Sequence, residues 1–89
     1  MTDYYFTKKA IEDLSGIWEY TVQKWSEQQA DKYYLMIIDL CKEIAEDPGI
    51  GKQYAGIAAN LCGYKAGKHI IFYRCLSQSL IEITRILHE

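Results

Sequence analysis

The residues whose types suggest chemistry gather in the last third of the chain. They are cationic, imidazole and phenol side chains, at Lys65, Lys68, His69, Tyr73, Arg74, Arg85 and His88. Metal-free cleavage of RNA needs a base for the 2′-hydroxyl proton, an acid for the leaving oxygen and cations for the charged transition state. Tyr73 or His88 could act as the acid or base, and Arg74 and Arg85 as the cations. One hypothesis is therefore a catalytic centre for RNA cleavage.

A structural role is the alternative for the same side chains, and the charge of the chain favours it. Arg74 and Arg85 would then pair with helix carboxylates or lie at strand ends, and His88 would pack near the end of the last strand. The formal net charge is −2, whereas proteins that grip nucleic acid usually carry a net positive charge. We therefore expect no sequence-specific binding of nucleic acid.

No metal or cofactor site is expected. The spacings of the three cysteines and two histidines match no known metal pattern. The one glycine-rich stretch, residues 49–51, lacks the Lys-Ser/Thr of a phosphate-binding loop.

Glu82 alternates with two isoleucines, Ile81 and Ile83, and should therefore point to the opposite face of its strand from them.

The expected location is the cytoplasm. An odd number of scattered cysteines, Cys41, Cys62 and Cys75, fits small buried or half-buried side chains in a reducing compartment. The sequence has no recognisable signal peptide, and no apolar run approaches the ~20 residues that a membrane span needs. We expect neither disulfides nor a membrane segment.

Two helices are predicted before these residues. After a short strand at residues 4–6, Thr7 is a plausible N-cap, and apolar residues then recur at helical spacing as far as Trp25. Ser26 followed three residues later by Gln29 fits a capping box, so a second helix should begin almost at once. Residues 47–49, Asp-Pro-Gly, should end that helix near position 46. Such a short link predicts an antiparallel helical hairpin.

Three strands are predicted after a loop at residues 49–58. They cover residues 61–65, 69–75 and 80–88, and short turns between them indicate an antiparallel meander. The first strand should pair at an edge or beside the last strand. The 89 residues allow one domain, residues 1–89, in which a helical hairpin packs on a small sheet in an α+β fold.

The chain resembles the RelE/ParE superfamily of toxins from type II toxin–antitoxin modules, and its ParE branch most of all. The similar segments are Ala10-Ile11-Glu12-Asp13-Leu14-x-x-Ile17-Trp18-x-Tyr20, Trp25-Ser26-x-x-Gln29-Ala30-x-x-Tyr33, Asp47-Pro48-x-x-Gly51, Gly67-x-His69-Ile70-Ile71-Phe72-Tyr73-Arg74 and Ile83-x-Arg85-Ile86-Leu87-His88. They cover nearly the whole chain in order. The resemblance implies a β-α-α-β-β-β fold with a twisted antiparallel sheet.

The resemblance also implies a function. ParE-like toxins inhibit DNA gyrase and are neutralised by a ParD-type antitoxin, whereas RelE-like toxins cut messenger RNA on the ribosome. The Trp-Ser-x-x-Gln-Ala helix link and the acidic balance of charge favour the ParE branch. The expected protein is therefore a gyrase-binding toxin and not an enzyme. The alternatives are a ribosome-dependent endoribonuclease using Tyr73, Arg74, Arg85 and His88, and a non-toxic relative that binds an antitoxin.

The expected antitoxin site is a groove between the helices and the sheet. Aromatic anchors are offered there by Trp18, Trp25, Tyr33 and Tyr34, because protein interfaces concentrate their binding energy in such side chains. All four side chains could instead be part of the hydrophobic core, and for Trp18 and Tyr33 the core is the favoured interpretation. The cations expected to contact a partner are Lys65, Arg74 and Arg85.

Overall fold

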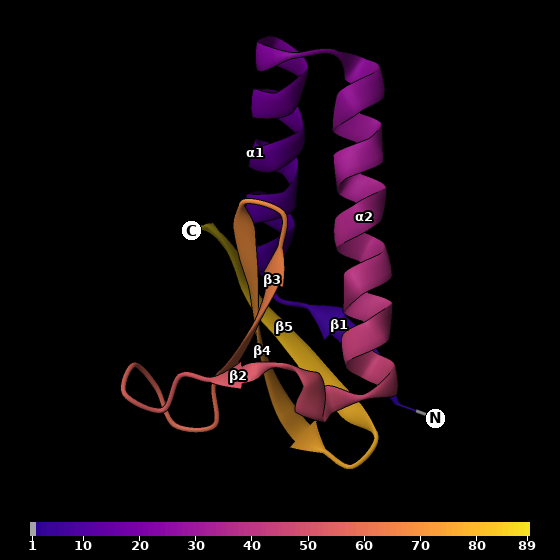
Figure 1. The fold of residues 1–89 in the computed structure, drawn as a ribbon. Helices are drawn as coiled ribbons and strands as arrows, with labels where there is room; N and C mark the ends of the chain where they lie inside the picture. The colour runs from indigo at the N-terminus through magenta and orange to yellow at the C-terminus, as the bar shows by residue number, and fades with distance from the viewer. Residues whose placement is uncertain (1) are drawn as a thin grey trace.

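The computed structural model describes residues 2–89 and shows two layers, a helical hairpin packed on a five-stranded sheet (Figure 1). The elements in chain order are β1 (Asp3–Phe6), α1 (Lys8–Lys24), α2 (Glu27–Glu46), the 3-10 turn η1 (Pro48–Ile50), β2 (Lys52–Gln53), β3 (Cys62–Ala66), β4 (His69–Ser77) and β5 (Leu80–His88). The predicted α+β class and helical hairpin are confirmed. The hairpin extends beyond the sheet at one end of the molecule (Figure 1).

Both helices begin where the sequence predicts. Thr7 Oγ1 accepts a hydrogen bond from Ala10 N at 3.1 Å and donates one to the carbonyl oxygen of Thr84 at 2.8 Å. The N-cap of α1 therefore also fastens the helix to β5. Ser26 Oγ accepts from Gln29 N at 3.0 Å, which is the Ser half of the predicted capping box.

The sheet has the order β1-β5-β4-β3-β2, with the predicted antiparallel meander at its centre. One expectation was wrong: the sheet is mixed, because β1 pairs with β5 in parallel. The helical hairpin returns the chain to the end from which β1 starts (Figure 1). Because β3, β4 and β5 alternate in direction, β5 runs in the same direction as β1. Residues 52 and 53, predicted as loop, form the short strand β2.

The core lies between α2 and the inner face of the sheet. Fully buried side chains of α2 (Ile37, Cys41 and Ile44) meet those of the strands (Ile71, Tyr73, Ile81, Ile83 and Ile86). Burial of one such isoleucine contributes about 1.5–3 kcal/mol to folding. Cys41 is buried and Cys62 half-buried, as expected, but Cys75 is exposed. No helix among residues 2–89 has the length and apolar character needed to cross a bilayer.

Candidate functional site

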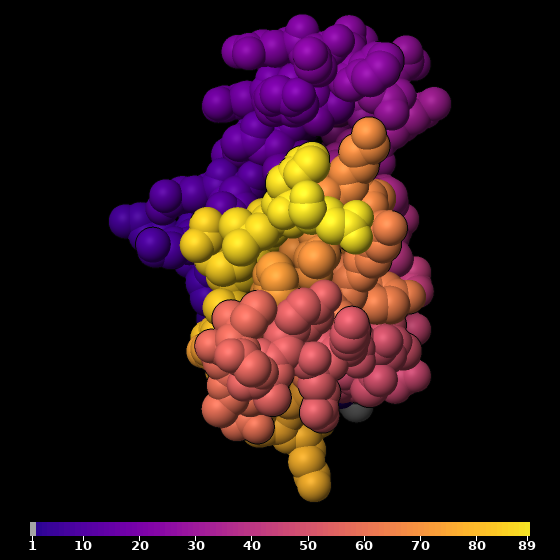
Figure 2. Space-filling view, turned by 60° about the vertical axis from the view of Figure 1, so that its left-hand side comes forward, coloured from indigo at the N-terminus to yellow at the C-terminus, as the bar shows by residue number. Residues whose placement is uncertain are grey.

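A groove of about 910 Å³ runs between α1, the start of α2 and the β4–β5 end of the sheet. Its lining residues come from all three places: Glu12, Asp13, Gly16, Ile17, Tyr20, Thr21, Lys24, Trp25, Gln29, Tyr33, Lys68, His69, Ile86, Leu87 and His88. Figure 2 shows the C-terminal end of the chain (yellow) below the projecting hairpin (indigo). The groove exists because the hairpin is longer than the sheet that it covers.

The α1 wall of the groove is a stripe with helical spacing. Its members are Asp13, Gly16, Ile17, Tyr20, Thr21 and Lys24, which recur at intervals of three and four positions along one face. Tyr20 is 62% exposed and Trp25 is 76% exposed. Sequence reasoning missed Tyr20, although its spacing to Ile17 and Lys24 could have indicated this second stripe. An exposed aromatic pair beside a groove is a feature of surfaces that bind proteins.

Tyr33 lines the groove, and its hydroxyl makes hydrogen bonds with the β3–β4 turn. Its hydroxyl lies 3.2 Å from Ala66 O, accepts from Lys68 N at 2.9 Å and lies 2.7 Å from His69 Nδ1. Gly67 has a φ of +62°, and a Cβ there would lie 2.7 Å from the Tyr33 hydroxyl. Only glycine allows both this backbone conformation and this approach.

His69 and His88 stand side by side at the end of the sheet. They are directly opposed in the β4–β5 register, with ring centroids 5.0 Å apart and planes at 80°. Burial lowers the pKa of His69 below its ordinary value, and the neighbouring His88 lowers it further. His88 is exposed, and its Nδ1 lies 3.0 Å from the main-chain oxygen of Glu89.

An ion pair between Asp13 and Arg85 braces α1 against β5 along the groove wall. Arg85 donates from Nε and Nη2 at 2.8 and 3.0 Å, and Ile86 N donates to the same carboxylate at 3.0 Å. Burial alone would raise the pKa of Asp13, but the hydrogen bonds from Arg85 and Ile86 and the charge of Arg85 lower it overall. The carboxylate thus satisfies both a guanidinium and a backbone N–H of the sheet edge.

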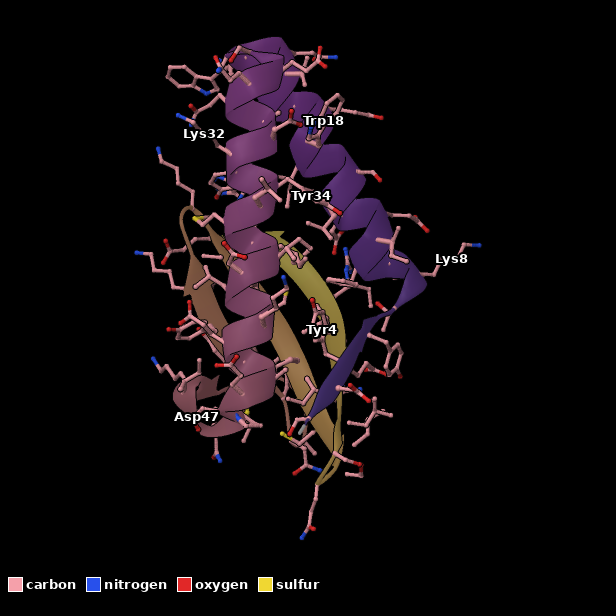
Figure 3. The ribbon with its side chains drawn as sticks, turned by 90° about the vertical axis from the view of Figure 1, so that its right-hand side faces the viewer. Tyr4, Lys8, Trp18, Lys32, Tyr34 and Asp47 are labelled. Carbon is pink, nitrogen blue, oxygen red and sulfur yellow. The ribbon has the colours of Figure 1, made fainter. Side chains whose placement is uncertain are left out.

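The structure separates the four predicted aromatic anchors. Trp25 and Tyr33 line the groove, whereas Trp18 and Tyr34 line a second hollow of about 480 Å³. Figure 3 shows Trp18 and Tyr34 between α1 and α2. Trp18 is half-buried there and donates from Nε1 to Asp31 at 2.9 Å. Trp18 therefore links the two helices of the hairpin.

The residues of the proposed nuclease centre do not converge. Tyr73 is fully buried, donates to Pro48 O at 2.6 Å and accepts from Gly51 N at 3.0 Å, and burial raises its pKa to about 12. A fully buried phenol with a raised pKa is poorly placed to act as the acid or base of the RNA-cleavage hypothesis. Arg74 is paired in register with Glu82, on the face away from the helices. Arg85 is held by Asp13, and His88 lies in the groove.

The expected cationic contacts also lie outside the groove. Lys65 is exposed on β3, with Nζ 3.5 Å from the Glu89 carboxylate. The Arg74 guanidinium has a buried Nε with no hydrogen-bond partner among residues 2–89. Over the same residues, no group of three His, Cys, Asp or Glu side chains is placed to hold a metal ion.

Comparison with known proteins decides the family. Residues 4–89 match the family described as "ParE toxin of type II toxin-antitoxin system, parDE". The chain belongs to the ParE toxin family. It is 34% identical over 89 residues to "Toxin ParE1" of Caulobacter vibrioides, covering all of this chain and 91% of that toxin. "Toxin ParE1" of Mycobacterium tuberculosis is 29% identical over 86 residues, covering 97% of this chain and 88% of the toxin. The sequence resemblance to the ParE branch is thereby confirmed.

A solved structure supports the fold of this ParE-family chain. The structure is described as "Chromosomal ParDE TA system from P. aeruginosa" and superposes with a TM-score of 0.84. The superposition covers 99% of this chain and 96% of the other, at 20% sequence identity. The two-layer arrangement is thus shared although most side chains differ.

Proposed function

We propose that this chain is a toxin that inhibits DNA gyrase in the cytoplasm and is neutralised by a ParD-type antitoxin. The observation that carries the proposal is membership of the ParE toxin family, whose description names a type II toxin–antitoxin system. The solved neighbour is itself described as a ParDE system. An antitoxin partner for this chain follows by analogy with these relatives.

The groove is the proposed antitoxin site. Its walls combine exposed aromatic surface at Tyr20 and Trp25 with the polar end of the sheet. A helix with one apolar face fits such a groove, because its anchoring side chains project at intervals of three and four residues. Trp25 and Tyr33 are the anchors that we propose from the original four, with Tyr20 in addition.

The edge of β5 offers a second contact for the same partner. Within residues 2–89, β1 pairs with residues 80–83 of β5, and no strand pairs with the same side of β5 over residues 84–88. Asp13 caps the N–H of Ile86. The N–H groups of a strand alternate in direction, so that of His88 points the same way as that of Ile86. Thr7 also donates to Thr84 O, so an extended segment of the antitoxin can pair with the end of this edge, at residues 87 and 88.

Gyrase inhibition is proposed to require binding but no catalytic step by this chain. Support comes from the scattered positions of the four residues that RNA cleavage would need, above all the burial of Tyr73. Arg74 and Lys65 lie outside the groove and remain candidates for gyrase contact.

The proposal is tested in cells by induced expression of the chain in a bacterial host. We expect growth arrest with an SOS response, because trapped gyrase leaves broken DNA, and relief on co-expression of the ParD-type antitoxin. Normal growth at a verified level of folded protein would instead identify a non-toxic relative. Arrest without an SOS response but with rapid loss of messenger RNA would favour the RelE-like activity.

A further inference from the structure

The two histidines of the chain meet across two strands, and no step of the proposed toxin function uses their imidazole nitrogens. The β4–β5 register, rather than their spacing in the sequence, places His69 directly opposite His88. Both residues line the groove, and His88 is exposed. The chain has no other imidazole.

Hydrogen bonding around His69 determines which ring nitrogen carries the proton. The Tyr33 hydroxyl has one hydrogen to donate and two lone pairs to accept with. Lys68 N can only donate to it, and Ala66 O can only accept from it. All three contacts of the hydroxyl are satisfied when His69 Nδ1–H donates across the 2.7 Å separation. Nε2 of His69 then keeps a free lone pair.

The same reasoning applies to His88. Its Nδ1 lies 3.0 Å from the main-chain oxygen of Glu89, which can only accept a hydrogen bond. The proton of the neutral ring therefore belongs on Nδ1, and Nε2 again keeps its lone pair. Histidines that bind metal ions are commonly held in this way, with one ring N–H donated to a carbonyl or another oxygen.

The spacing of the two rings suits a shared metal ion. With Zn–N bonds of about 2.0–2.1 Å at a tetrahedral angle, two imidazoles bound through Nε2 have centroids about 5 Å apart. The observed separation is 5.0 Å. Tyr33 holds the His69 ring. The His88 ring and its contact with Glu89 O are exposed, so this contact can yield when the ring turns to aim its Nε2 at the same ion.

We propose that His69 and His88 form a two-imidazole site for a first-row divalent ion, Zn²⁺, Ni²⁺ or Cu²⁺. Imidazole nitrogens favour these ions over Mg²⁺ or Ca²⁺. Since no third protein ligand is in place among residues 2–89, water occupies the remaining coordination positions. Tyr33 is a positioning residue, because it sets the tautomer and orientation of His69 without touching the ion.

Calorimetric titration of the purified chain without a histidine tag tests the site. We expect one ion bound per chain, Cu²⁺ more tightly than Ni²⁺ or Zn²⁺, and no binding of Mg²⁺. His88→Ala and His69→Ala should each weaken binding at least tenfold. Tyr33→Phe, which keeps both imidazoles, should weaken it about 10–100-fold. Circular dichroism checks that each variant is folded.

Cys75→Ser is the matched control, because Cys75 is an exposed thiol that could bind the same ions. Affinity unchanged by Cys75→Ser and lost in His88→Ala would support the site. The proposal is overturned by the reverse pattern, by equal binding of Mg²⁺, or by the absence of saturable binding at millimolar ion. Nitrogen-15 NMR of the imidazoles adds a direct readout: the Nε2 signals of both rings should shift on binding of Zn²⁺.

Discussion

Asp13 and Arg85 lie 72 positions apart in the sequence and form a two-pronged ion pair that joins α1 to β5. The same carboxylate accepts the N–H of Ile86, the first residue beyond Arg85 along the strand. Asp13 is only 15% exposed, and Arg85 is 37% exposed. The pair therefore sets the position of the helix that forms one wall of the groove.

Asp13→Asn should destabilise the fold at neutral pH. The substitution removes a partly buried charge that accepts three hydrogen bonds, for an expected loss of about 1–2 kcal/mol in the free energy of unfolding. The pKa of Asp13 is lowered in the folded state. Its contribution is therefore full above the ordinary pKa of 3.8 and disappears as the pH falls through the lowered value.

Urea denaturation of the native chain and the variant at pH 7 and at about pH 3 checks this linkage. The difference between the two proteins should shrink at the lower pH. Glu12→Gln is the matched control, because Glu12 is the exposed neighbour of Asp13, and it should change the free energy by less than about 0.5 kcal/mol. A difference for Asp13→Asn that stays constant with pH would contradict the assigned role of the ion pair.

Tyr73→Phe should affect stability and leave toxicity unchanged. The substitution leaves Pro48 O and Gly51 N without their hydrogen-bond partner in the core, at an expected cost of about 1–3 kcal/mol. Chemical denaturation measures the cost, and Tyr64→Phe serves as control, since Tyr64 is a half-buried tyrosine on the neighbouring strand β3. If folded Tyr73→Phe protein lost toxicity at full stability, a catalytic phenol would have to be reconsidered.

Trp25→Ala should weaken antitoxin binding without unfolding the chain. Trp25 is largely exposed, so its removal should change stability by less than about 0.5 kcal/mol. Loss of a central aromatic anchor commonly costs about 2 kcal/mol or more of binding energy, a reduction in affinity of roughly 30-fold. Biolayer interferometry with the ParD-type antitoxin measures this change.

Leu35→Ala is the comparison for Trp25, because Leu35 is 58% exposed on α2 and lines neither hollow. It should leave affinity unchanged. Trp18→Ala is expected to lower stability instead, since it removes the hydrogen bond to Asp31 between the helices. Equal losses of affinity for Leu35→Ala and Trp25→Ala would argue against the groove as the binding site.

Local signals in the sequence predicted most of the fold. The caps at Thr7 and Ser26 and the stop at Pro48 act within a few residues, so they can be recognised without the rest of the chain. The strand β2 escaped prediction because two residues carry no alternating pattern. Whether β1 runs parallel or antiparallel to β5 depends on the end of the sheet at which the helical hairpin finishes. No short segment of the sequence contains that information.

The candidate site was harder to predict because it depends on contacts between distant elements. In the sequence, nothing distinguishes Asp13 from the other polar residues of its helix. Its role as the partner of Arg85 is visible only once α1 is packed beside β5. Trp18 and Trp25 lie on one predicted helix, yet they line different hollows. Tyr73 carries a phenol that could act as an acid or base. It nevertheless lies at a position of β4 that faces the core, where it is fully buried.

The most direct test of gyrase inhibition is a gyrase reaction with the purified chain, relaxed plasmid and ATP, followed on an agarose gel. We expect loss of supercoiling and accumulation of linear DNA trapped on gyrase, both reversed by the ParD-type antitoxin. Tyr73→Phe protein, if folded, should act like the native chain. Undiminished supercoiling at a stoichiometric excess of folded chain would contradict gyrase inhibition.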